Sequence, residues 1–436
     1  MNIKRRAWYH KMERIELKNL RVVDNIIEYE YEVSEGLLKY FKNPRKKYIM
    51  EYQQNDTPCS ICDVPESVLT VPFICNMLPL VWLADATLYV NCLDSDFYHC
   101  MDNLKQGYIE MYPEAKFLGS VDVGSIEKNK KEGESVGLFF SGGVDAYTSL
   151  VRTAKKRPYL VSIWGADIFF DNVKGWESVH KCLKEAAGKF DLPLVTVRSS
   201  FREIFNEQVL DAQFKDILQD LWWHAVQHGV SIIGHAAPVA YKYGLKMQYI
   251  ASSYSNADQN VRCASYPTLD NTIQYAGCSV YHDGFELTRT DKIRDIDAFC
   301  KANNKKINIH VCWQDANGKN CCMCEKCWRT MAEFWSQGIE PADYGFSYNE
   351  YKLKFMKRYL QLDFDFSDAT RGFWLSIQKE FKKNKELISL FQYYNRIKWI
   401  ETFDFYSVNN NCKRKLYLLV SKVIRFFRKR RENGRV

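Results

Sequence analysis

The chain of 436 residues carries 61 Lys or Arg against 53 Asp or Glu, a formal net charge of +8, and 46% of its residues are apolar. This length predicts two or three domains. The composition is that of a folded globular protein, which excludes a disordered chain and one mostly embedded in a membrane. Residues 413–436 hold ten Lys or Arg and one acid, so the rest of the chain has a formal charge of about −1 and no general basic field for nucleic acid.

Neither export nor membrane insertion is expected from the sequence. Residues 1–11 are basic but lack the apolar stretch of a signal peptide. No segment reaches the length of a membrane span, because prolines and polar residues interrupt the most apolar stretch, residues 71–90. We therefore expect a cytoplasmic protein whose 15 cysteines are thiols or metal ligands rather than disulfides.

Residues 1–121 predict an α+β accessory domain that binds a substrate or a partner. Segments rich in Val, Ile and Tyr predict antiparallel strands at residues 15–23, 26–33 and 47–53. A helix is predicted at residues 97–112. Cys59 and Cys62 have the spacing of a metal knuckle, but no second pair lies nearby, and two semi-buried thiols are favoured. Residues 122–135 are rich in charge and predict an exposed linker at a domain border.

Residues 136–150 are the stretch around which the chain is organised. Their apolar start suits a strand buried on both faces. Gly142 and Gly143 lack the Cβ atoms that would keep a phosphate from the backbone N–H groups. A helix beginning at Val144 adds free N–H groups and the positive end of its dipole, and Asp145 supplies a carboxylate for a metal ion. This order predicts an anion site, although an isolated Ser-Gly-Gly also occurs in plain tight turns.

Strands and helices alternate after this loop. Strands are expected at residues 159–164, 194–197 and 247–252. The alternation predicts an α/β fold with a parallel sheet and helices on both faces. Ligands in such sheets bind beyond the carboxyl ends of the strands, where three segments would gather: residues 141–145, 165–167 and 252–255.

Helices are expected at residues 176–190 and 232–243, and a longer helical region ends near residue 228. In that region His224 and His228 lie four residues apart, a spacing that can hold zinc on one helix face. No acid at the intervening positions supports a protease site, and a structural role is favoured for this pair.

Four cysteines form the second strong signal. Cys312, Cys321, Cys324 and Cys327 fall within sixteen residues. Four thiolates at such spacing suit tetrahedral Zn²⁺, with a Zn–S distance of about 2.3 Å. Cys322 is a fifth cysteine, which either replaces Cys321 as a ligand or lies beside the site as a free thiol.

The loop resembles the SGGxDS signature of the PP-loop ATP pyrophosphatase superfamily, whose members cleave ATP between the α- and β-phosphates. By that resemblance Ser141, Gly142, Gly143 and Asp145 hold the pyrophosphate and its Mg²⁺. The sequence departs from the signature at Ala146, where the family usually has a serine, so one hydroxyl contact to phosphate is missing.

The order of the two motifs resembles the cyano-deazaguanine synthase family of the queuosine pathway, in which a loop of this kind precedes a four-cysteine zinc site. The resemblance covers about residues 136–335, within a predicted ATP-binding domain of residues 136–343. Cys322 stands where the family often has glycine. The regions before and after have no counterpart in that enzyme, so its particular substrate is not carried over.

Between the motifs, residues 281–292 form a polar, titratable segment around one glycine. His282, Glu286 and Arg289 are candidates for substrate contact or proton transfer, because this loop faces the nucleotide in related sheets. A solvated loop with local salt bridges explains these side chains nearly as well.

Residues 344–436 predict a helical region, with helices at residues 351–359, 373–382 and 387–394. In residues 413–436, apolar and basic side chains occupy opposite halves of a helical wheel. This tail is predicted to lie on an anionic membrane surface or an acidic partner, and a terminal helix packed on its own domain is the alternative.

These features predict an ATP-dependent, AMP-forming ligase that uses ATP, Mg²⁺ and Zn²⁺. It would adenylate a substrate oxygen, release pyrophosphate and let a nitrogen nucleophile displace AMP. The acceptor, a small molecule or a protein, is not specified by the sequence. One alternative is a tRNA thiolation enzyme, which is disfavoured because the chain outside residues 413–436 has almost no net charge. Another is a nucleotide-binding partner protein without catalysis.

Overall fold

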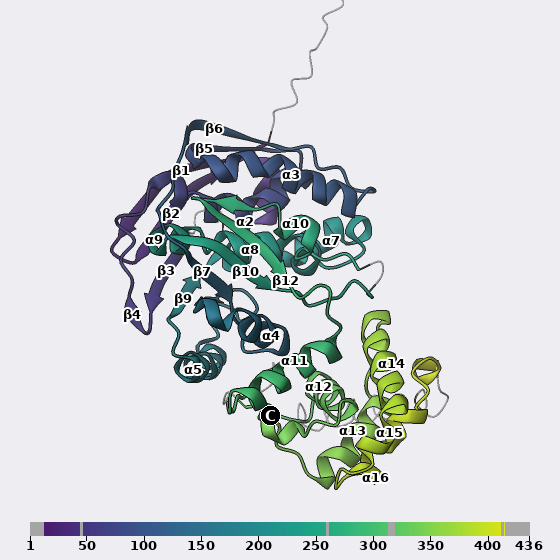
Figure 1. Cartoon of the computed structure of the whole chain (residues 1–436). Coiled ribbons are helices and arrows are strands. Elements are labelled where there is room, and N and C mark those ends of the chain that lie inside the picture. The colour runs from purple at the N-terminus through teal and green to yellow at the C-terminus, as the bar shows by residue number, and fades with distance from the viewer. Residues whose placement is uncertain (1–12, 44–46, 259–260, 313–318, 411–413, 415–436) are drawn as a thin grey trace, which may run out of the picture. The chain divides into compact units, whose positions relative to one another are not determined.

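The computed structural model describes residues 13–43, 47–258, 261–312, 319–410 and 414, which belong to two units. The first unit contains Met1–Ser141, Asp145–Trp176 and Leu183–Glu286. The second contains Gly142–Val144, Glu177–Cys182 and Leu287–Val436. The sheet of the chain lies in the first unit, and the second is helical in its described part (Figure 1).

Parallel strands form one half of the sheet, in the order β12-β10-β7-β8-β9. Their bounds are β7 Ser135–Phe139, β8 Tyr159–Trp164, β9 Leu194–Ser199, β10 Leu245–Ala251 and β12 Cys278–Asp283. Both faces of these strands are covered, since β7 and β9 are buried over nearly their whole length. Helices flank the sheet in Figure 1, and the predicted α/β class with a largely parallel sheet is confirmed.

The sheet continues into the N-terminal part of the chain, because β9 pairs antiparallel with β3. The order from there is β3-β2-β1-β5-β6, while β4 pairs with β3 and β11 with β12. The bounds are β1 Arg14–Val23, β2 Ile26–Val33, β3 Tyr48–Gln54, β4 Thr57–Pro58, β5 Thr87–Asp94, β6 Ser120–Glu127 and β11 Gln274–Tyr275. The three predicted N-terminal strands are therefore confirmed, within a sheet that they share with β7 to β12.

The linker predicted at residues 122–135 is partly wrong. Residues 122–127 belong to β6, which pairs in parallel with β5 along the edge of the sheet. The side chains of β6 are mostly exposed, as the sequence indicated, but its backbone is bonded into the sheet. An exposed edge strand with few apolar residues therefore resembles a loop in its composition.

The helices of the first unit have the bounds α1 Glu66–Leu69, α2 Val71–Leu83, α3 Ser95–Met111, α4 Val144–Thr153, α5 Val173–Phe190, α6 Phe201–Ile204, α7 Glu207–Leu218, α8 His228–Gly234, α9 Ala237–Tyr243 and α10 Pro267–Asp270. The helices expected at residues 97–112 and 176–190, and the helix beginning at Val144, are confirmed. The helical region expected to end near residue 228 is wrong, because it is interrupted after Leu218 and continues past His228 to Gly234. The single helix expected over residues 232–243 is wrong: α8 and α9 are separated at His235 and Ala236. Pro238 in the first turn of α9 suits a helix start, because its missing N–H costs nothing there.

One apolar stretch bears on the membrane prediction. Glu66–Leu83, which joins α1 and α2, is long and apolar enough to cross a membrane, contrary to the expectation that no segment would reach that length. However, 89% of this stretch is buried inside the fold. That burial is what the core helix of a folded domain shows.

In the second unit, α11, α13 and α14 pack on α12, while α15 packs on α14 and α16 on α13. Their bounds are α11 Arg289–Ala302, α12 Glu325–Ser336, α13 Glu350–Leu362, α14 Asp368–Lys383, α15 Lys385–Ile388 and α16 Tyr394–Ile397. Trp374 of α14 donates its Nε1 hydrogen to Glu325 of α12 at 2.9 Å, and the ring of Tyr359 of α13 lies 5.2 Å from that of Trp328. The helices expected at residues 351–359 and 373–382 are confirmed. The single helix expected at 387–394 is wrong, since α15 already ends at Ile388 and α16 begins only at Tyr394.

Most of the basic tail, residues 413–436, lies outside the described residues. Its one described residue, Arg414, is 1% exposed and not on the surface. Its guanidinium donates to Asn409 at 2.8 Å and pairs with Asp365. This cation is thus bound within its own unit.

A buried polar network joins the two halves of the sheet around His235. Its Nδ1 lies 2.5 Å from the carbonyl oxygen of Ser231, so Nδ1 carries the proton and Nε2 accepts from Ser199 Oγ at 2.7 Å. Tyr48 Oη lies 3.2 Å from the same Nε2, and Asn76 donates to Tyr48 at 3.1 Å. Burial, only partly offset by the bond to Ser231, lowers the pKa of His235 to about 4.

This histidine should make the protein less stable in acid. An unfolded histidine binds a proton near its ordinary pKa of 6.5, whereas folded His235 stays neutral down to about 4. Protons therefore favour the unfolded state, and stability is lost as the pH falls from about 6.5 to 4, by about 3 kcal/mol. In urea titrations across this range, His235→Gln should show a flatter pH dependence than the parent chain. The exposed His99→Gln should keep the parent slope, and an unchanged slope in His235→Gln would contradict the assignment.

Candidate nucleotide and metal sites

The predicted strand, glycine loop and helix are present at residues 135–153. β7 ends at Phe139, the exposed Ser141 opens the loop, and α4 begins at Val144. Gly142 has φ +77°, a left-handed conformation that favours glycine, which accounts for its place in the loop. The N–H groups of the first helical turn have no acceptor further along the same helix, which is the general feature through which helix N-termini bind anions.

Two side chains at the start of α4 bear on the chemistry. Asp145 lies in the first turn of the helix and is half-buried. Ala146, the residue at which the loop departs from the SGGxDS signature, is 4% exposed and faces the fold rather than solvent. The carboxylate of Asp145 is the loop's metal-binding group by residue type, because Mg²⁺ prefers oxygen ligands.

A buried carboxylate fixes α4 to the end of β12. Ser149 Oγ donates to Asp283 Oδ2 at 2.6 Å, and Arg152 Nε donates to Asp283 Oδ1 at 3.2 Å. Arg152 also donates to Glu286 at 2.6 Å. The Ser149 hydroxyl is thus engaged by Asp283. Asp283 was not predicted as a site residue, although it lies within the polar segment of residues 281–292.

The three candidates from residues 281–292 lie in different surroundings. His282 is 4% exposed, and its Nδ1 lies 2.7 Å from the buried Asp270. Glu286 is paired with Arg152 in the first unit. Arg289 opens α11 in the second unit and pairs with Glu333 at 3.2 Å. Catalytic roles for His282, Glu286 and Arg289 remain predictions.

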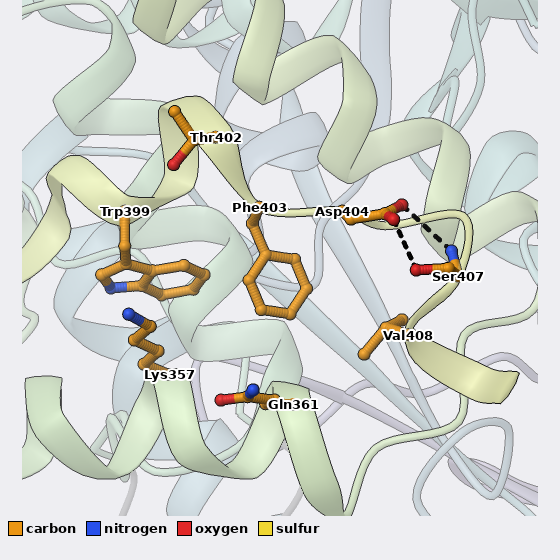
Figure 2. Close-up of a pocket in the computed structure, with 8 residues that line it drawn as sticks. All are labelled: Lys357, Gln361, Trp399, Thr402, Phe403, Asp404, Ser407 and Val408. Carbon is orange, nitrogen blue, oxygen red and sulfur yellow. Dashed lines mark hydrogen bonds between the residues drawn. The ribbon is translucent and has the colours of Figure 1, made fainter. Parts of the chain in front are cut away.

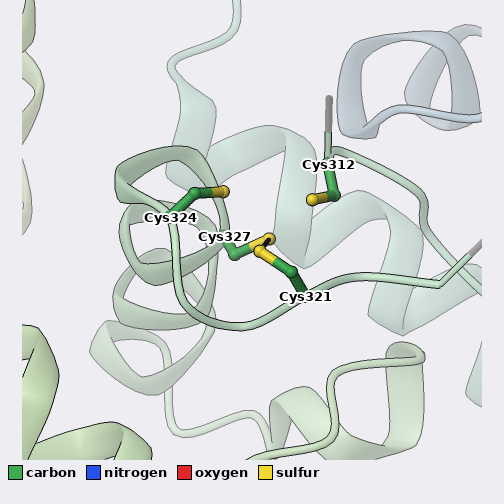
Figure 3. A group of neighbouring side chains, drawn as sticks. All are labelled: Cys312, Cys321, Cys324 and Cys327. Carbon is green, nitrogen blue, oxygen red and sulfur yellow. Dashed lines mark hydrogen bonds between the residues drawn. The ribbon is translucent and has the colours of Figure 1, made fainter. Parts of the chain in front are cut away.

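Four cysteines of the second unit come together as their spacing predicted (Figure 3). The sulfurs of Cys312, Cys321, Cys324 and Cys327 all lie within 4.8 Å of one another, which is close enough to hold a metal ion. Cys321 and Cys327 are 3.8 Å apart, and a regular tetrahedron with Zn–S of about 2.3 Å has edges of about 3.8 Å. This donor set of four soft ligands is compatible with zinc.

Local hydrogen bonds bring the four sulfurs together. Asn320 accepts from the N–H of Val311 at 3.0 Å and donates to the carbonyl of Ile309 at 2.7 Å, which holds the Cys312 segment beside Cys321. Cys324 caps the N-terminus of α12, and Cys327 lies in the first turn of that helix. The hydrogen bond with Cys312 raises the pKa of Cys324 to about 12, because neighbouring thiolates repel one another without a cation between them.

Cys322 lies outside this cluster. Its φ of +53° turns the side chain away, and its Sγ lies 3.5 Å from the carbonyl oxygen of Asn320. Its own carbonyl accepts from Trp328 Nε1 at 2.8 Å. Of the two adjacent cysteines, Cys321 is therefore the one placed as a ligand.

The second unit also contains a surface pocket that the sequence did not indicate (Figure 2). It is lined by Lys357, Gln361, Trp399, Thr402, Phe403, Asp404, Ser407 and Val408. Lys357 Nζ lies 5.9 Å from the centre of the Trp399 ring, and Asp404 accepts from the backbone N–H and the hydroxyl of Ser407. The acid and the base of this pocket are thus both in contact with neighbouring residues of its wall.

The cysteine cluster predicts about one zinc per chain, since binding by four thiolates contributes directly to folding. Cys324→Ser should lose the metal and several degrees of melting temperature, because three thiolates remain around an unfilled position. Cys322→Ser is the matched control and should retain the metal. Metal analysis of the purified chains decides the question, and full zinc in Cys324→Ser or none in the parent would contradict the site.

Comparison with known proteins assigns no family to this arrangement. No protein-family model matches the chain, and no curated protein matches its sequence. The chemistry of the loop and of the cysteine cluster is therefore inferred from their own residues and geometry.

Proposed function

We propose that the chain is an ATP-dependent, AMP-forming ligase related to the PP-loop enzymes. It adenylates a substrate oxygen, releases pyrophosphate and lets a nitrogen nucleophile displace AMP. The observation that carries this proposal is the loop between β7 and α4, with Gly142 at φ +77° and Asp145 in the first helical turn. β7 lies between β10 and β8, and the loop follows its carboxyl end, the position at which parallel α/β sheets bind ligands.

The composition of the loop favours attack at the α-phosphate. Loops that support γ-phosphate transfer carry a lysine that reaches the β- and γ-phosphates. Residues 136–151 contain no lysine or arginine. The nearest cation on α4, Arg152, is engaged by Asp283 and Glu286. Backbone N–H groups are then the main donors to a pyrophosphate leaving group.

The residues present fit the expected cofactors. Asp145 would hold Mg²⁺, which neutralises charge on the phosphates and on the pyrophosphate that leaves. Cys312, Cys321, Cys324 and Cys327 would hold a structural Zn²⁺, because a closed set of four protein ligands leaves no position for substrate. The protein's own contribution is to position the two reactants and to stabilise developing charge.

Product analysis tests this function directly. The full chain is incubated with Mg²⁺, α-labelled ATP, hydroxylamine as the nitrogen nucleophile, and a panel of carboxylic acids that begins with benzoate, nicotinate and acetate. AMP and pyrophosphate should form with at least one acid, in amounts equal to the hydroxamate. ADP and phosphate as the main products would overturn the proposal, and so would ATP binding without any turnover.

Asp145→Asn should lower AMP formation by at least about a hundredfold, because an amide is a poor ligand for Mg²⁺. The fold should survive, since the side chain is half-buried and lies at a helix start. Asp122→Asn, the same change on the exposed edge strand β6, is the matched control and should keep parent activity. Equal activity in Asp145→Asn would remove this carboxylate from the site.

A further inference from the structure

A second group of reactive side chains surrounds Cys263 in the first unit. His228 Nε2 lies 3.7 Å from Cys263 Sγ. The rings of His228 and His224 stack at 5.8 Å with an angle of 16°, and His224 Nδ1 lies 2.6 Å from Asp220 Oδ2. His224 Nε2 lies 3.2 Å from Tyr254 Oη. A thiol, two imidazoles and a carboxylate thus form one connected set.

A turn of π-helix, Trp223–Gln227, creates this arrangement. The wider turn stacks the ring of His224 on that of His228. A structural role had been expected for these two residues. His228 Nδ1 lies 3.2 Å from the carbonyl oxygen of Trp223, and a carbonyl oxygen can only accept a hydrogen bond. Nδ1 therefore keeps its proton, and Nε2 is the atom turned toward the thiol. Single π-turns of this kind are frequent at functional sites.

The charges of the group favour a thiolate beside an imidazolium. Burial opposes ionisation of the thiol, but His228 and His224 outweigh it and lower the pKa of Cys263 to about 6. The hydrogen bond that His224 donates to the Asp220 carboxylate raises the pKa of His224 to about 10. Other titratable or charged groups that face the thiol or border it are Asp167, Tyr254, Tyr108, Tyr112 and Arg262.

The group lies at the same edge of the sheet as the glycine loop. Tyr254 follows β10, and Trp223 Nε1 donates to Asp167, which follows β8, at 3.1 Å. β10 and β8 are the two neighbours of β7, and all three run parallel, so their carboxyl ends share one edge. The group is not a metal site, since among the described residues only the four cysteines have three or more ligand atoms within metal-binding distance.

We propose that Cys263 is a nucleophile that takes the acyl group from the adenylate formed at the loop and holds it as a thioester. This step rests on the proposed function. Cys263 Sγ attacks the carbonyl carbon of the acyl adenylate, a C–S bond forms, the C–O bond to phosphate breaks, and AMP leaves with the electron pair. The nitrogen nucleophile then attacks the thioester, the C–S bond breaks, and the thiolate is restored.

The two histidines hold the protons of these steps. His228 keeps the proton that left the thiol, and after thioester formation this proton is free to pass to the departing phosphate oxygen. Neutral His228 then accepts the proton that the nitrogen nucleophile loses as the amide forms, which restores the starting ion pair. Asp220 acts through His224 and is a positioning residue.

The pH dependence of alkylation tests the nucleophile without any substrate. The native full chain is treated with iodoacetamide, a probe small enough for a residue that is 2% exposed, and each cysteine is followed by mass spectrometry. From pH 6.5 to 8.5 the alkylation rate of Cys263 should rise less than about twofold, whereas a thiol of ordinary pKa rises about fiftyfold. The exposed Cys62 is the internal reference.

Asp220→Asn should shift the Cys263 profile toward that of Cys62, because His224 loses the carboxylate that keeps it protonated. The Cys62 profile should not change, and a structural role for Asp220 would not move the Cys263 profile. A Cys263 rate that rises as steeply as that of Cys62 in the parent chain would overturn the proposal. So would a Cys263 that reacts only after denaturation.

Acyl transfer is tested with the carboxylic acid that supports AMP formation, in radiolabelled form. With ATP and no hydroxylamine, the label should appear on Cys263, be released by neutral hydroxylamine, and be lost in Cys263→Ser but kept in Cys62→Ser. AMP formation without labelled Cys263 would overturn the thioester and leave the ligase intact. Absence of AMP with every acid would overturn both, since the thioester needs the adenylate.

Discussion

The parallel alignment of β10, β7 and β8 is the constraint on which the candidate chemistry depends. Because parallel strands end at a common edge, the segments that follow them meet there although they are far apart in the sequence. The glycine loop follows β7, Asp167 follows β8 and Tyr254 follows β10. Most residues of β7 and β8 and the second half of β10 are buried, and this burial holds the edge in place.

Asp283 also fixes the position of α4, the helix that follows the glycine loop. It is the last residue of β12, its side chain is 5% exposed, and it accepts from Ser149 and Arg152 of α4. A buried carboxylate is stable only when its oxygens are bonded, and here both are. The second half of α4 is thereby fixed to a strand two places away from β7 in the sheet.

The sequence predicted what is encoded over short distances. Apolar runs predicted β7 and β9, and cysteine spacing predicted which sulfurs come together around Cys312 and Cys327. The pairing of β3 with β9 leaves no periodic signal, because it joins segments far apart in the chain. For the same reason the sequence around His224 did not indicate Cys263, because the thiol comes from another segment of the chain. The π-helical turn also departs from the 3.6-residue spacing by which α-helices are recognised.

The sheet has two unequal edges, formed by β11 and β6. β11 is only the two residues Gln274–Tyr275, too short to template pairing with a second chain. β6 is longer and mostly exposed, but it carries Asp122 and Glu127. Charges on an exposed edge disfavour strand-to-strand association. The strand whose sequence resembles a linker thus carries acids that disfavour pairing with a second chain at the long edge of the sheet.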